Sequence, residues 1–184
     1  MQCVVAGNGH DTTFSKSLAL VDLPSGEALR LTGAEVAALA PAWSPDGAHI
    51  AYAAGLDNGQ TATSRTSTEP LARLRRIYVM QLNGSEQRQL TTDPNYRDER
   101  PLWLADGQRL LFARIDNAGQ ASLWRVNTDG GGLTQLVDDI ATPKDNRYGR
   151  LAWAESFDLR LTREVTEVRP DGLPPSTQPA APRY

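Results

Sequence analysis

The sequence is poor in the residues from which cross-links and metal sites are built. Its 184 residues include one cysteine, Cys3, and two histidines, His10 and His49. A single cysteine excludes an internal disulfide and a cysteine-based zinc site, and two histidines by themselves cannot make a three-ligand metal site. We therefore expect a fold that is held by its own packing, with no metal and no cofactor.

Neither an excess of positive charge nor a long apolar run is present. The 19 basic and 22 acidic side chains give a formal net charge of −3, whereas binding to nucleic acid or to an anionic membrane surface requires a basic field. No run approaches the roughly eighteen apolar residues of a membrane span, and no export signal is visible in the sequence. The sequence thus predicts no nucleic-acid partner and no membrane span.

The usual catalytic patterns are missing as well. The Gly-x-Ser-x-Gly elbow of α/β-hydrolases does not occur, and no glycine-rich loop opens a helix. The acidic stretch 93–99 lacks the alternating spacing of a calcium loop. Cys3 and His10 could in principle pair as nucleophile and base, but a cysteine in a terminal strand is more often a small buried apolar group. We expect a protein that is not an enzyme and has no catalytic residues.

What the sequence does contain is an internal repeat. The phrase "PAWSPDGAHIAYA" begins at Pro41 and returns 60 residues later as "PLWLADGQRLLFA". Trp43 and Trp103 hold the same place in it, and Trp153 follows after a further 50 residues. Between these phrases lies a second repeated unit, found as "SLALVDLPSGEALRLT", "RIYVMQLNGSEQRQLT" and "SLWRVNTDGGGLTQLV". Self-similarity at this spacing indicates a repeat architecture.

Each repeat is predicted to contain four short strands. Ser-Pro-Asp-Gly predicts a tight turn, because proline presets φ and Gly47, like Gly107 in the next repeat, adopts a positive φ at little cost. Four antiparallel strands with an aromatic at a fixed place are typical of a β-propeller blade. A generic β-sandwich would need the hairpins but not the repeated phrase. Helix is expected only as short turns near 34–40 and 69–76.

The repeated phrases also resemble a known family. "P-x-W-S-P-D-G-x-x-I-A-Y", followed by "I-Y-V-M-x-L-N-G" and "Q-L-T", resembles the WD-like blade repeats of TolB-like β-propellers, over roughly residues 15–155. The next repeat has Leu104 and Ala105 in place of Ser-Pro, and the stretch after Trp153 has no Asp-Gly. The resemblance implies an all-β propeller and, since TolB-like proteins are typically exported, a periplasmic or otherwise extracytoplasmic location.

The chain has fewer blades than a full ring needs. We expect a TolB-like β-propeller segment over residues 1–168 and a Pro-rich disordered tail over 169–184. The segment divides into a partial blade at 1–32, whole blades at 40–91 and 99–137, and a partial blade at 148–168. Even small propellers have about four blades, so we expect an incomplete or open ring in a fragment of a longer protein.

Two alternatives to a fragment remain at this stage. Two copies could close one ring, or the terminal strands could seal a small one. An open ring exposes strand edges and apolar blade faces, which predicts possible self-association through those edges.

Strand direction divides the connections between two faces. Turns inside hairpins are short and share one face, whereas the other face collects the long connections 7–16, 33–40, 54–75, 92–100 and 138–149. Long loops on a rigid scaffold are where binding residues concentrate. The residues predicted to bind a partner are Tyr96, Arg97, Asp98, Glu99, Arg100, Lys144, Arg147 and Tyr148. The alternative is that these charges only solvate loops. The recurring tryptophans are expected to pack between blades rather than to stack on a ligand.

Two classes of function follow from this reading. The first is a non-enzymatic scaffold that binds a protein or another macromolecule on the face with the long loops. The second, which the resemblance implies as the alternative, is the propeller of an enzyme, either a prolyl-oligopeptidase-like serine peptidase or a polysaccharide lyase, without its catalytic residues. Propellers occur in binding proteins and in enzymes alike, so the fold by itself does not choose between the two.

Overall fold

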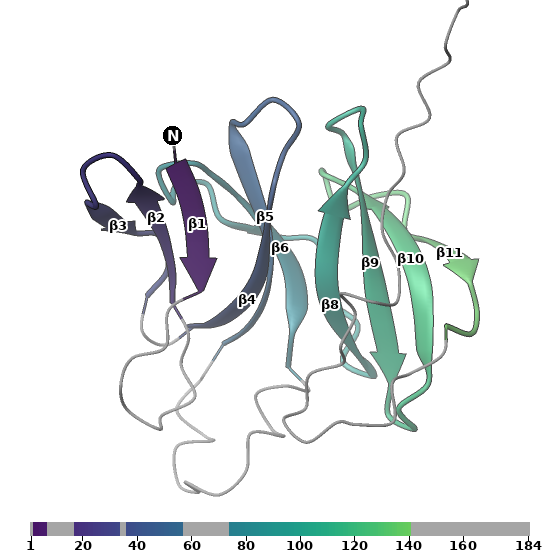
Figure 1. Ribbon diagram of the computed structural model, residues 1–184. Helices are drawn as coiled ribbons and strands as arrows, with labels where there is room; N and C mark the ends of the chain where they lie inside the picture. Colours follow the sequence, from purple (N-terminus) through teal and green to yellow (C-terminus); the bar gives the residue numbers. More distant parts are fainter. Residues whose placement is uncertain (1, 7–16, 34–35, 57–73, 141–184) are drawn as a thin grey trace, which may run out of the picture.

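The computed structural model describes residues 2–6, 17–33, 36–56 and 74–140, and these form three antiparallel sheets (Figure 1). The first sheet contains β1 (Gln2–Ala6), β2 (Leu18–Asp22) and β3 (Ala28–Arg30). The second contains β4 (Val36–Trp43), β5 (His49–Leu56), β6 (Arg76–Gln81) and β7 (Arg88–Gln89). The third contains β8 (Tyr96–Trp103), β9 (Arg109–Asp116), β10 (Ala121–Asn127) and β11 (Thr134–Val137).

The strand order in each sheet is the order of a propeller blade. Strands β4, β5, β6 and β7 are neighbours in sequence order, and so are β8, β9, β10 and β11. The two four-stranded sheets are called the second and third blades below, and the sheet of β1–β3 the first blade. Figure 1 shows the blades side by side, and the described residues contain no helix. The fold is therefore an all-β propeller segment with an incomplete ring, as the repeat predicts.

The core lies between blades. One apolar cluster joins the first and second blades around Leu18, Ile50 and Tyr52. Another joins the second and third around Ile77, Leu110 and Phe112. Since side chains alternate between the two faces of a strand, each middle strand contributes to the cluster on either side of its sheet. Adjacent blades thus share their cores.

Both four-stranded blades contain the same β-bulge in their first strand. The pairing of β4 with β5 shifts between Leu39 and Ala42, and that of β8 with β9 shifts between Glu99 and Leu102. The residue before the repeated proline has a positive φ in each case, 49° at Ala40 and 50° at Arg100. Proline cannot donate to a strand ladder, so an irregular position suits it. The repeat therefore specifies the bulge as well as the turn.

Two expectations about local structure were wrong. Residues 36–40 belong to β4 rather than to a helical turn, because Val36, Ala37, Ala38 and Leu39 are buried against the neighbouring blade and strand. No helix occurs at Leu74–Arg76 either, since β6 begins at Arg76. The rest of the segment expected to turn near 69–76 lies outside the described residues.

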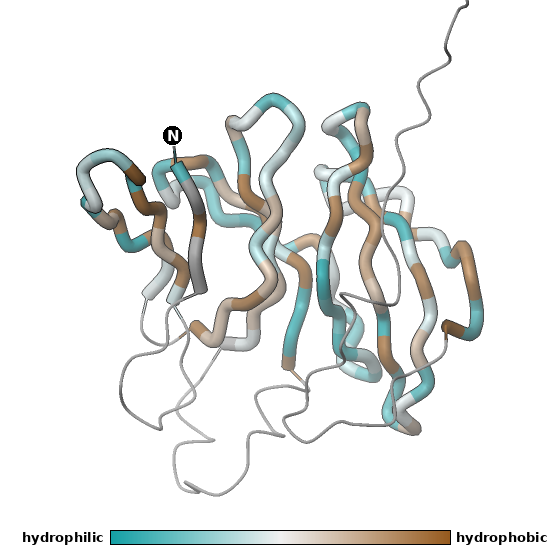
Figure 2. Tube along the Cα trace, viewed as in Figure 1, coloured by the Kyte–Doolittle hydropathy of each residue, from teal (hydrophilic) through white to brown (hydrophobic). Residues whose placement is uncertain are grey.

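The loop expected at 92–100 was also placed wrongly, because β8 begins at Tyr96. The charged run suggested a solvated loop, but Tyr96 to Glu99 pair with β9 residue by residue, up to the bulge. Figure 2 shows the contrast in colour: the start of β4 is largely apolar, whereas the start of β8 is hydrophilic. Both strands nevertheless hold the first position of their blades.

Candidate functional site

The tight turns of one face have their polar groups committed to backbone geometry. The Asp46 carboxylate accepts hydrogen bonds from the Ser44 hydroxyl (2.5 Å) and the Ala48 N–H (3.0 Å). The Ser44 hydroxyl and the Ala48 N–H hold the pKa of Asp46 below its usual range. In the third blade Asp106 accepts from the Gln108 N–H (2.9 Å), which likewise lowers its pKa. The carboxylates of these two turns are thus used by donors of their own turns.

The predicted positive φ angles occur at these turns. Gly47 has φ 71° and Gly107 has φ 65°. A Cβ added to Gly47 would meet no atom within 4 Å, so its requirement for glycine lies in the backbone angle and not in crowding. The turn prediction from Ser-Pro-Asp-Gly and Leu-Ala-Asp-Gly is confirmed in both blades.

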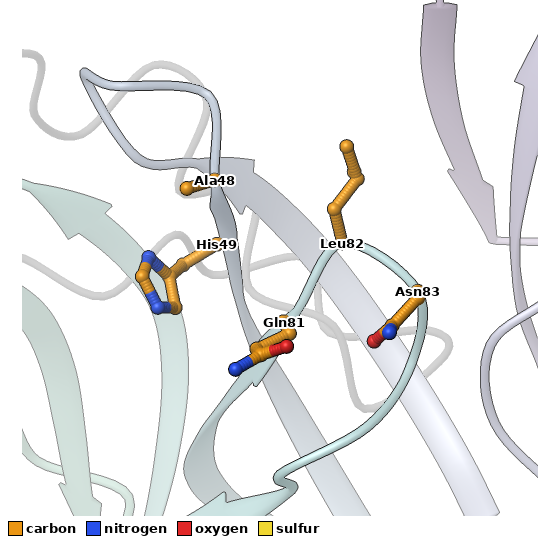
Figure 3. A pocket seen from close by; sticks show the side chains of 5 residues that line it. All are labelled: Ala48, His49, Gln81, Leu82 and Asn83. Atoms are coloured by element: carbon orange, nitrogen blue, oxygen red, sulfur yellow. The ribbon is translucent and has the colours of Figure 1, made fainter.

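One hollow lies beside the tight turns of the second blade. It has a volume of about 460 Å³ and is lined by Ala48, His49, Gln81, Leu82 and Asn83 (Figure 3). The His49 ring lies 6.4 Å from the Trp103 ring of the third blade. No carboxylate, hydroxyl or thiol is among the lining residues, so the hollow offers His49 no partner for nucleophilic or acid–base chemistry.

The candidate residues at the start of β8 form a polar cluster against the second blade. Asp98 is fully buried and accepts two hydrogen bonds from the Arg114 guanidinium, at 2.7 Å from Nε and 3.0 Å from Nη2. The Arg114 guanidinium also lies over the rings of Tyr96 (5.0 Å), Phe112 (5.4 Å) and Trp124 (4.8 Å). A bidentate pair inside an aromatic enclosure fixes the geometry of both strands.

A second buried ion pair ties the connection before β6 to β8. Arg75 Nη1 lies 2.6 Å from Glu99 Oε1, and both side chains are largely buried. The Arg75 carbonyl accepts from the Asp98 N–H at 3.0 Å, so residue 75 runs along the free edge of β8. The next residue, Arg76, donates to the carbonyl oxygen of Tyr96 at 2.8 Å. The Glu99 side chain and the Asp98 N–H thus join two blades, whereas the Asp98 carboxylate joins two strands of the third blade.

Three of the candidate residues keep part of their surface exposed. Tyr96, Arg97 and Arg100 are half-buried. The Arg97 Nε lies 3.5 Å from Glu99 Oε1 without making a hydrogen bond. These three side chains share β8, with Tyr96 and Arg97 at the end where the chain enters from the second blade and Arg100 at the bulge. The other three candidates, Lys144, Arg147 and Tyr148, lie outside the described residues.

The sequence analysis missed residues that hold this cluster together. Arg114, Trp124 and Arg75 were not singled out, because each lies in a strand or connection that the repeat explains without them. A signal was nevertheless available: Arg114 stands where the second blade has Ala54, and a charge at an apolar repeat position calls for a partner. The equivalent of Ala38 is Asp98, which supplies that partner.

The described residues contain neither a cluster of metal ligands nor a membrane-spanning helix. Nowhere in that part of the chain do three or more histidine, cysteine, aspartate or glutamate side chains gather as a metal ion would require. The same residues include no helix long and apolar enough to cross a membrane.

Comparison with known proteins gives the same fold. No protein family model matches the chain. The chain is 27% identical over 178 residues to the "Uncharacterized peptidase YuxL" of Bacillus subtilis (strain 168), a match that covers 94% of this chain and 25% of that protein. The chain therefore spans a quarter of the length of this curated relative.

Among solved structures, TolB from Acinetobacter baumannii superposes with a TM-score of 0.55 at 18% identity, covering 74% of this chain and 30% of TolB. Oligogalacturonate lyase from Vibrio parahaemolyticus superposes with a TM-score of 0.53 at 17% identity, covering 78% of this chain and 35% of the lyase. The described residues have the fold of a TolB-like β-propeller segment. At these identities the likeness concerns the fold and not the activity.

Proposed function

We propose that this chain is a propeller scaffold that binds a protein or another macromolecule, and that it does so on the face of the long connections. The observation that carries the proposal is the partial exposure of Tyr96, Arg97 and Arg100 on a strand whose neighbouring residues are fixed by buried ion pairs. Tyrosine and arginine are enriched among the residues that dominate binding energy, and a rigid support reduces the entropy lost on binding.

The opposite face is the less favourable one. Its turns use Asp46, Ser44 and Asp106 to satisfy their own backbone amides, and its glycines are required by their φ angles. The likeness to TolB supports a binding role in a periplasmic or otherwise extracytoplasmic setting, which forms part of the same proposal.

An alanine scan of the whole chain tests which face binds. With a partner captured from an extract and identified, binding should weaken by about 1 to 3 kcal/mol, the scale of a true interface anchor, for Arg97→Ala, Arg147→Ala or Tyr148→Ala. The matched controls Gln108→Ala and Ser85→Ala, both on exposed residues of the tight-turn face, should leave the affinity unchanged. The reverse pattern would move the site to the tight turns and reject the proposal.

A second candidate is the propeller of an enzyme. The specific observation in its favour is the 27% identity with a protein named as a peptidase, of which this chain covers a quarter. Sequencing the gene on both sides of this reading frame decides the matter. A downstream hydrolase domain with a Gly-x-Ser-x-Gly elbow would support the peptidase, whereas histidines placed on a central channel would support the lyase.

A further inference from the structure

The interface between the second and third blades shows how this protein joins one repeat to the next. The second blade contributes the small and branched side chains of Ala51, Ala53, Ile77 and Val79. The third blade places Trp103 against them, and the Trp103 Nε1–H donates to the Ala42 carbonyl oxygen at 3.0 Å. Trp103 therefore anchors the third blade to the second, and Trp43 packs against the cluster between the first and second blades.

The far face of the third blade, which points away from the second, repeats the surface against which Trp103 packs. The strand pairings identify equivalent residues in the two blades. Leu111 and Ala113 of β9 correspond to Ala51 and Ala53 of β5, and Leu123 and Arg125 of β10 correspond to Ile77 and Val79 of β6. Three of these four side chains are apolar, and Leu111 and Ala113 are buried. The equivalent of Ala42 is Leu102, whose carbonyl oxygen takes the place of the acceptor for an indole.

The fourth residue of this surface differs from its equivalent in charge. Where the second blade has Val79, the third has Arg125, and the Arg125 Nε is buried without a hydrogen-bond partner. An orphaned guanidinium nitrogen in a partly buried position is costly unless an acceptor meets it. What covers this face should therefore carry a carboxylate as well as an aromatic ring.

One segment of the chain has both groups at the right place in the sequence. "RLAWAESFDLRL" begins at Arg150 and carries Trp153, the third tryptophan of the repeat, followed by Glu155 and Asp158. We propose that residues 148–168 dock on the far face of the third blade. In this arrangement the Trp153 Nε1–H donates to the Leu102 carbonyl oxygen, and a carboxylate of Glu155 or Asp158 pairs with Arg125.

Amide hydrogen exchange on the full chain tests the docking. Trp153→Phe keeps a ring but removes the donor, so exchange in β9 and β10 should accelerate by roughly tenfold while β5 and β6 stay protected. The matched control is Trp103→Phe, which should accelerate exchange in β5 and β6 instead. Unchanged exchange in β9 and β10 after Trp153→Phe would overturn the proposal. Loss of their protection on dilution of the parent chain would overturn it too, because it would show that a second copy covers the face.

The charge pairing has its own test. Arg125→Met should accelerate exchange in β9 and β10, and one of the two variants Glu155→Gln and Asp158→Asn should do so to the same extent. Combined with Arg125→Met, that variant should add nothing further, because both changes remove one interaction. Fully additive effects for both carboxylates would reject the pairing with Arg125.

Discussion

The second and third blades place opposite chemistry at the same point of the same fold. In the second blade Ala38 on β4 pairs directly with Ala54 on β5, and in the third Asp98 on β8 pairs with Arg114 on β9. All four side chains are buried. An apolar pair and an ion pair thus occupy the same position in two blades. The backbone geometry of the blade therefore tolerates both kinds of side chain at this position.

The two pairs differ in how much stability is lost when one member is substituted. A change of size in a buried apolar pair typically costs about 1 to 3 kcal/mol, whereas a buried charge without its partner costs about 3 to 5 kcal/mol. The third blade should therefore be the more vulnerable of the two to single substitutions at this point.

The largest expected effect comes from Asp98→Ala, which gives the third blade the residue of the second. It leaves Arg114 buried and unpaired, so the free energy of unfolding should fall by about 3 to 5 kcal/mol in urea denaturation. Asp98→Ala combined with Arg114→Met should recover most of that loss. The control Arg109→Met breaks an exposed pair with Asp106 and should cost at most about 1 kcal/mol. A single and a double variant of equal stability would refute the ion-pair argument.

A smaller effect, equal in both blades, is expected at the turns. Gly47→Val and Gly107→Val each force a β-branched residue to a positive φ, which should lower the free energy of unfolding by about 1 to 3 kcal/mol. Ala105→Val, in the same turn as Gly107 and exposed, should stay within about 0.5 kcal/mol of the parent. A cost at one glycine only would show that the two turns are not equivalent.

The smallest expected effect is a change in the pKa of the turn carboxylate, and it should differ between the two turns. Ser44 donates to Asp46, whereas the equivalent residue Leu104 has no hydroxyl to offer Asp106. A carboxyl with a lowered pKa stabilises the fold above the pKa of the unfolded chain, near 4, and that contribution is lost as pH falls through the folded pKa. Ser44→Ala should raise the pKa of Asp46 in an NMR titration and leave Asp106 unchanged. Equal shifts at both sites would contradict this assignment.

The repeated phrases were sufficient to predict the blade, because turns and apolar alternation are local properties. Gly47 and Gly107 were placed correctly for that reason. The extent of the first strands was not predictable in the same way. β4 begins at Val36 because its side chains pack on another blade, and β8 begins at Tyr96 because Arg114 and Arg75 come from elsewhere in the chain to meet its carboxylates.

Five of the predicted binding residues, Tyr96 to Arg100, come from the same charged run and stay a prediction as a binding site. These residues lie on β8, the first strand of the third blade. Which of them are buried and which keep exposed surface depends on partners from other parts of the chain. The Asp98 and Glu99 side chains are buried, whereas Arg97 and Arg100 keep part of their surface exposed. No local sequence pattern distinguishes the two pairs of residues, because all four are charged and adjacent in the sequence.

The bulge before the repeated proline has a consequence for how the gene can change. In a regular strand Asp98 and Trp103, five positions apart, would face opposite sides of the sheet. The extra residue at the bulge lets both side chains face the second blade. On that side Asp98 pairs with Arg114 of β9, and Trp103 donates to the Ala42 carbonyl oxygen of the second blade. Deleting the single codon for Arg100 would therefore invert half of β8 and send either the tryptophan or the carboxylate to the wrong side. The number of residues in this strand is therefore as important to the fold as their identity.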